Sequence, residues 1–150
     1  PRRLWFTSQA QNFSLPVAGR ILSFWDVVGV VGGEGGKELF NAQLGVLLNE
    51  GKSVVIYPEG NLRPFEKELQ PFHKGAFHVA ITEQVPILPI VAVPETRKMW
   101  WGDLRRGMRV EVLPPVYPPP LPAKGEYVAA VTALRDQVFQ MMSTRMAAAN

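Results

Sequence analysis

The sequence has 150 residues and a mass of 16.7 kDa, and its 47% hydrophobic and 19% charged residues exclude a disordered chain and fit a single globular domain. The absence of cysteine excludes disulfides, cysteine nucleophiles and cysteine-ligated metal sites. The net charge of +3 suits an anionic partner, such as a phosphate ester, a coenzyme or a membrane surface, but does not choose among them.

The first part of the chain predicts strands that alternate with helices. The strand segments are short, nearly continuous apolar runs rich in valine and isoleucine, which is typical of strands buried on both faces of a sheet. A glycine follows the second helical segment at the position where a helix commonly ends. In chain order we expect a strand at Arg2–Ser8, a helix at Leu15–Ser23, a strand at Trp25–Val31, a helix at Lys37–Asn49 ended by Gly51, and a strand at Ser53–Tyr57.

The second part of the chain continues the alternation and then becomes rich in proline. We expect a helix at Lys74–Glu83, a strand at Pro86–Val93, an edge strand at Arg109–Leu113, a proline-rich connector at 114–124 and a C-terminal helix within 125–147. This order predicts an α/β fold, a mainly parallel sheet covered by helices, in one domain over 1–150.

The segment from Tyr57 to Arg63 contains the residue types most suited to ligand binding. It follows a predicted central strand, and ligands of open α/β sheets bind at the carboxyl ends of the strands. Gly60 would let the backbone approach a ligand closely, while Glu59 offers an acceptor and Arg63 a forked donor that matches phosphate oxygens. From spacing alone, a phosphate site and a plain charged turn remain equally open.

Three blocks in order give this sequence a family resemblance. VVIYPEGNLR, LQPFHKGAFHVA and VPILPI, followed by LPPV, resemble the phospholipid/glycerol acyltransferase family of the 1-acylglycerol-3-phosphate acyltransferase (PlsC) type. The resemblance covers Arg2 to about Val116. The resemblance implies transfer of a fatty acyl group from acyl-CoA or acyl carrier protein to the hydroxyl of a lysophosphatidate-type lipid.

The resemblance also implies which residues bind the acceptor. Pro58, Glu59 and Gly60 match the Pro-Glu-Gly core of the family's glycerol-phosphate block. Asn61 stands where the family has threonine and Leu62 where it has arginine, and Arg63 supplies a guanidinium one place later.

Further matches lie in the later blocks, and one earlier block departs from the family. Lys74 and Gly75 match a Lys-Gly pair that adds positive charge, and Pro86 and Pro89 match a proline block that shapes the acyl and acceptor pocket. The stretch 27–31 runs into glycines where the family has a second phosphate-binding arginine.

The family's catalytic pair is a His-x4-Asp motif upstream of these blocks, in which histidine acts as general base and aspartate fixes its tautomer. This chain begins at Pro1 and its histidines are His73 and His78. The His-x4-Glu spacing of His78 and Glu83 places them about 140° apart on a helix, so we expect a structural role for His78. We therefore predict an N-terminally truncated domain, without a catalytic residue of its own and inactive alone.

A basic and aromatic segment follows the last block, with Arg97, Lys98, Trp100, Trp101, Arg105 and Arg106. Such a loop suits a membrane surface, and it equally suits tryptophans packed on a core. Nucleic acid is not expected, because no nucleic-acid-binding signature accompanies it. No apolar run reaches the ~18 residues of a membrane span.

The expectations for function are an acyltransferase of phospholipid synthesis at the cytoplasmic face of a membrane. Its partners are the acyl donor, the lysophospholipid and the membrane surface, and it needs neither a metal nor a resident cofactor because the thioester is already activated. The alternative is a non-catalytic lipid- or membrane-binding module derived from an acyltransferase.

Overall fold

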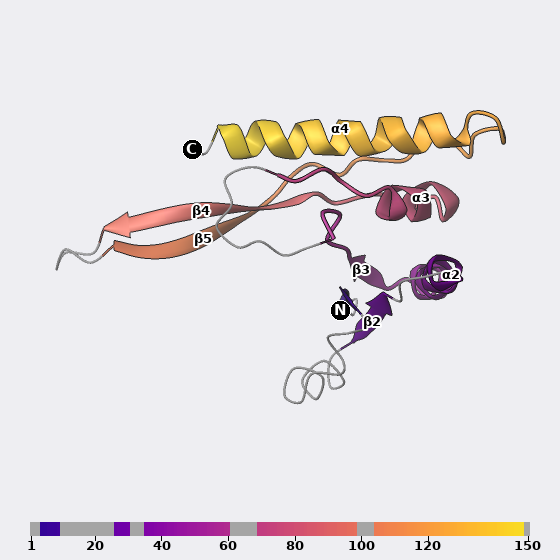
Figure 1. The fold of residues 1–150 in the computed structure, drawn as a ribbon, viewed down its shortest axis with the longest axis horizontal. Coiled ribbons are helices and arrows are strands. Elements are labelled where there is room, and N and C mark those ends of the chain that lie inside the picture. Colours follow the sequence, from indigo (N-terminus) through magenta and orange to yellow (C-terminus); the bar gives the residue numbers. More distant parts are fainter. Residues whose placement is uncertain (1–3, 10–25, 31–34, 61–68, 99–103, 149–150) are drawn as a thin grey trace. The chain divides into compact units, whose positions relative to one another are not determined.

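The computed structural model describes residues 4–9, 26–30, 35–60, 69–98 and 104–148 (Figure 1). The chain divides into two compact units, Pro1–Tyr57 and Pro58–Asn150. Each unit has its own sheet and its own helices, so each is taken in turn.

The first unit contains a three-stranded parallel sheet. Strand β1 (Leu4–Gln9) lies at its centre, with β2 (Val27–Val30) on one side and β3 (Ser53–Val55) on the other. Both neighbours run parallel to β1, with Phe6 opposite Val27 on one side and Val55 on the other. These parallel strands with their helices confirm the α/β class predicted from the apolar runs.

Helix α2 (Gly36–Asn49) leads from β2 to β3, over the range that the leucine spacing predicts. Its buried side chains include Leu44 and Leu47. The expected stop at Gly51 is confirmed: this residue has a φ of 74°, and its N–H donates to the carbonyl of Leu48 at 2.9 Å.

The second unit contains the larger buried core. Helix α3 (Gly75–Thr82) and helix α4 (Tyr127–Ala147) pack on one another, and α4 also packs on strand β4 (Ile90–Lys98). The buried side chains of α4 recur every three or four residues, as one helix face requires. The core consists of Phe72, Phe77, Ala80, Ile81, Val91, Val93, Val116, Val131, Leu134, Val138, Met142 and Met146.

Strand β4 pairs antiparallel with β5 (Leu104–Val112), which corrects two expectations. The strand expected from Pro86 begins at Ile90 instead, because Pro86 and Pro89 have no N–H to donate to a sheet. The basic segment expected as a loop lies largely in the two strands: Arg97 pairs with Arg105 in the ladder.

Several expected features fall outside the described residues, namely the helix at Leu15–Ser23, the residues Asn61 and Arg63, and the tryptophans at 100 and 101. Within the described residues, no helix has the length and apolarity needed to cross a membrane.

Candidate functional site

The Pro-Glu-Gly segment at 58–60 opens the second unit, directly after the chain leaves β3. The His73 N–H donates to the carbonyl of Pro58 at 2.8 Å, so the turn at 58–60 lies beside the segment that leads into α3. Two of the three blocks found in the sequence are thus in contact. The contact is a hydrogen bond between two backbone groups, so it does not depend on side chains.

The carboxylate of Glu59 makes a second link between the same segments. Its Oε2 accepts a hydrogen bond from the backbone N–H of Gln70 at 2.9 Å, in a partly buried position. A charged acceptor on a backbone N–H makes one of the stronger hydrogen bonds in proteins. Glu59 therefore holds the loop in place, a role that the spacing of the motif does not reveal.

Gly60 is required by the shape of the loop. Its φ of 74° lies in the left-handed region that favours glycine. A Cβ at this position would lie 3.0 Å from Nε2 and 3.1 Å from Cδ2 of His73. The imidazole of His73 therefore occupies the space that a side chain at position 60 would need.

His73 was not among the residues predicted to form the site, yet the structure places it there. The residue before it explains its fixed position: Phe72 is buried in the core, with its ring 5.0 Å from Phe139 and 6.2 Å from Phe77, measured between ring centroids. The signal that could have found His73 is its place in the second block, immediately before Lys74.

Lys74 and Gly75 lie at the start of α3. Lys74 is the N-cap residue, its side chain is exposed, and Gly75 is the first residue of the helix. A helix N-terminus carries a partial positive charge, to which the Lys74 ammonium adds a full one. The start of α3 and the loop at 58–60 therefore lie side by side, with the exposed Lys74 ammonium on one and the Glu59 carboxylate on the other.

The proline block lies elsewhere in the second unit. Pro86 is exposed and Pro89 is buried, and the carbonyl of Pro89 accepts a hydrogen bond from the N–H of Leu113 at 2.9 Å. The residue between them, Ile87, forms a bridge with Val116. Among the described site residues, the structure therefore joins Pro58, Glu59 and Gly60 to the start of α3, while the prolines line the path into β4.

His78 has the structural role expected of it. Its Nδ1 lies 3.0 Å from the Tyr127 hydroxyl, and the two rings meet edge to face with 5.4 Å between centroids. The same hydroxyl lies 2.7 Å from the Thr82 hydroxyl. This network joins α3 to α4 at one end of the core.

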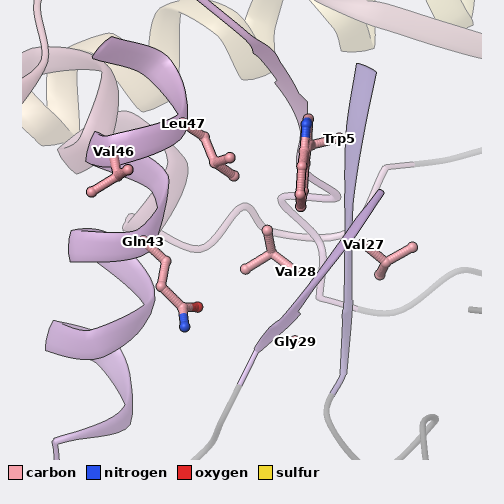
Figure 2. Close-up of a pocket in the computed structure, with 7 residues that line it drawn as sticks. All are labelled: Trp5, Val27, Val28, Gly29, Gln43, Val46 and Leu47. Atoms are coloured by element: carbon pink, nitrogen blue, oxygen red, sulfur yellow. The ribbon is translucent and has the colours of Figure 1, made fainter. Parts of the chain in front are cut away.

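The first unit contains an apolar cavity of about 370 Å³ between its sheet and α2 (Figure 2). The Nε1 of Trp5 is buried and has no hydrogen-bond partner among the residues that the structure describes. None of the predicted site residues lines the cavity. It is lined by Trp5, Val27, Val28, Gly29, Gln43, Val46 and Leu47.

A metal centre is not found in the described ranges, which contain no group of three or more histidine, aspartate or glutamate residues suited to hold one. The groups that the structure brings together at the loop are a glycine turn, the Glu59 carboxylate, the His73 imidazole and the start of α3.

Comparison with known proteins finds relatives with similar sequences. The chain is 37% identical over 102 residues to the 1-acyl-sn-glycerol-3-phosphate acyltransferase alpha of Homo sapiens, covering 65% of this chain and 34% of that protein. It is 40% identical over 65 residues to the 1-acyl-sn-glycerol-3-phosphate acyltransferase of Escherichia coli, covering 43% of this chain and 26% of that protein. The chain thus spans about a third of the length of these relatives or less.

No solved structure gives a significant match. The model of the Acyltransferase family matches residues 1–93, which include the loop at 58–60 and the start of α3. The chain therefore belongs to the acyltransferase family.

Proposed function

We propose that this protein is a glycerophospholipid acyltransferase, in which the loop at 58–60 and the start of α3 bind the phosphate of a lysophosphatidate-type acceptor. The observation that carries the proposal is the contact of Gly60 with His73, beside the exposed Lys74. It brings a glycine turn, an imidazole and an ammonium together at the family's acceptor-binding block.

Each residue has a separate part in this proposal. Lys74 supplies the positive charge for the phosphate, and Arg63 adds a guanidinium able to donate to two oxygens at once. Gly60 keeps the turn free of a side chain, so that the imidazole of His73 can lie against it. Glu59 holds the turn through its hydrogen bond to Gln70, and Pro86 and Pro89 shape the wall of the acyl pocket.

The reaction that fits these parts is the transfer of an acyl group from a thioester. The acceptor hydroxyl attacks the carbonyl carbon, the carbon–sulfur bond breaks, and the thiol leaves with the proton that a general base has taken from the hydroxyl. We propose acyl-CoA or acyl carrier protein as the donor, no resident cofactor, and the family's upstream His-x4-Asp pair as the base. Because the acceptor is amphiphilic, we propose that the protein acts at a membrane surface, on the cytoplasmic face of the membrane.

The second candidate is a lipid-binding module without catalysis. It is favoured by the hydrogen bond of His78 to Tyr127 and by the contact of His73 with Gly60, since neither histidine is described with an aspartate partner. Both candidates predict acceptor binding, and they differ only in turnover.

Acceptor binding can be measured by calorimetric titration with a short-chain lysophosphatidate below its micelle concentration. Lys74→Ala is expected to weaken binding about fivefold to tenfold, because a phosphate loses one charge-assisted contact. Lys124→Ala is the matched control, since Lys124 is an exposed lysine in the turn before α4. Equal affinities for the two variants would contradict the proposed site.

Turnover is measured as release of coenzyme A from acyl-CoA in the presence of lysophosphatidate. The 150-residue chain is expected to release none above the rate without protein, and release would show that a base lies within it. Release by the full-length gene product supports the enzyme. Acceptor binding without release by that product supports the module.

A further inference from the structure

One face of the β4–β5 hairpin is apolar and exposed. Because side chains alternate along a strand, every second cross-strand pair shares this face. Ile90 lies opposite Val112 and Ala92 lies opposite Val110, and all four are exposed, with 64% of Val110 accessible to solvent. Met108, two residues before Val110 on the same strand, continues the face.

The other face of the hairpin is packed. Val91 and Val93 on β4 are buried in the core of the second unit. Glu111 on β5 accepts two hydrogen bonds from the Arg145 guanidinium of α4, at 2.6 and 2.8 Å. A sheet with one face on its core normally presents polar side chains on the other face. The contiguous apolar outer face therefore indicates a binding surface rather than a requirement of folding.

The charge of this part of the chain indicates what binds there. The hairpin extends past the C-terminal end of α4, away from α3 (Figure 1). In sequence, residues 94–98 of β4 and 104–106 of β5 carry more basic than acidic residues. The basic residues are Arg97, Lys98, Arg105 and Arg106, and the acidic one is Glu95.

We propose that the apolar face of the hairpin, formed by Ile90, Ala92, Met108, Val110 and Val112, docks on a bilayer surface rich in anionic lipids. Apolar side chains would enter the headgroup region, while the basic residues attract lipid phosphates. A second copy of the chain fits less well, because two such basic segments would repel one another. The inference rests on the proposed function, which brings the protein to a lipid substrate.

Flotation of the full chain with vesicles tests the surface. Binding to vesicles that contain phosphatidylglycerol is expected to exceed binding to pure phosphatidylcholine and to fall as salt is added. The double variant Met108→Ser/Val110→Ser is expected to weaken binding to the anionic vesicles about tenfold, because two apolar side chains no longer enter the interface. Val128→Ser on α4, where valine is 66% exposed, is the matched control and should bind as the unchanged chain does.

A second pair of changes tests the electrostatic part. The pairs Thr96–Arg106 and Lys98–Leu104 fall on the same alternation as Ile90–Val112. Lys98→Gln/Arg106→Gln is therefore expected to weaken binding to phosphatidylglycerol vesicles about thirtyfold and to leave the weak binding to neutral vesicles unchanged. Equal binding of the unchanged chain to both kinds of vesicle would overturn the inference. So would wild-type binding by either double variant.

Sedimentation of the protein in solution tests whether a second copy of the chain occupies this face. A dimer that dissociates in Met108→Ser/Val110→Ser would place a second copy on the face and overturn the lipid surface. Both double variants should keep the unchanged affinity for short-chain lysophosphatidate in the absence of vesicles. If the double variants keep both their acceptor binding and their vesicle binding, only this inference is contradicted. If Lys74→Ala keeps the unchanged affinity for lysophosphatidate, the proposed acceptor site is contradicted instead.

Discussion

The two units of the chain differ in how the buried side chains among their described residues are packed. In the first unit, Leu44 is buried, and the buried Val28 and Leu47 line an apolar cavity of about 370 Å³. In the second, the buried side chains of two helices, a strand and the adjoining segments form one continuous cluster. Since burial of apolar area is the main source of stability, the second unit should be the more stable one.

The difference bears directly on the candidate site. The loop at 58–60 belongs to the better-packed unit, and it is joined there to a segment that Phe72 anchors in the core. A binding site held by packed neighbours loses little entropy when a ligand arrives. The backbone at Gly60 and His73 is therefore held in place where we propose that the acceptor binds.

The largest effect is expected from Phe77→Ala. Phe77 is 2% exposed in the cluster of the second unit, and removing its ring should lower the free energy of unfolding by about 3–5 kcal/mol. Denaturant unfolding measures the loss, and hydrogen exchange locates it. Faster exchange should appear at amides of α3 and α4; unchanged exchange there would contradict the described core.

A smaller loss is expected from Leu47→Ala in the first unit. Leu47 borders the existing cavity, so the substitution should cost about 2 kcal/mol, at the low end for a buried leucine. Amides of α2 and β1 should exchange faster while those of α4 keep their protection. If α4 lost protection equally, the two units would unfold together and the proposed difference between them would be wrong.

Gly60→Ala should cost about 1–2 kcal/mol and also weaken acceptor binding, because the left-handed φ is strained for alanine and the new Cβ meets His73. Gly51→Ala has the same φ of 74° with nothing within 4 Å of its Cβ, so it measures the backbone strain alone. Gly125→Ala, without a positive φ, should be nearly neutral. Full acceptor affinity in Gly60→Ala would show that the close approach of His73 to position 60 is not needed for acceptor binding.

The smallest effect is expected from Arg145→Ala, which removes the paired hydrogen bonds to Glu111 between α4 and the hairpin. The pair is partly exposed, so the cost should be about 1 kcal/mol. Arg135→Ala is the control, because its partner is the adjacent and exposed Asp136. Thermal unfolding should rank the two variants in this order, and the reverse order would contradict the described contact.

Local signals in the sequence predicted much of the fold. The apolar run from Ser53 and the leucine spacing of 37–49 found a strand and a helix, and Gly51 marked the end of that helix, because each depends on neighbouring residues. The long β4–β5 hairpin was not predicted, because the residues of a strand do not identify the strand with which it pairs. The start of β4 could have been read from the missing N–H of Pro89.

The candidate site, too, could be predicted from the sequence only in part. The resemblance identified Glu59, Gly60, Lys74 and Gly75, but not that Glu59 bonds to Gln70 or that His73 lies against Gly60. Those contacts join segments more than ten residues apart. Only the folded backbone brings them together.

The most direct test of the acceptor site uses the chain's two histidines as reporters. Side-chain nuclear magnetic resonance of the imidazole nitrogens can be followed during titration with short-chain lysophosphatidate, with His78 as the internal control because its Nδ1 lies 3.0 Å from the Tyr127 hydroxyl of α4. The site described above predicts a saturable shift at His73 and none at His78. Acceptor binding that leaves His73 unmoved, or shifts both histidines alike, would contradict it.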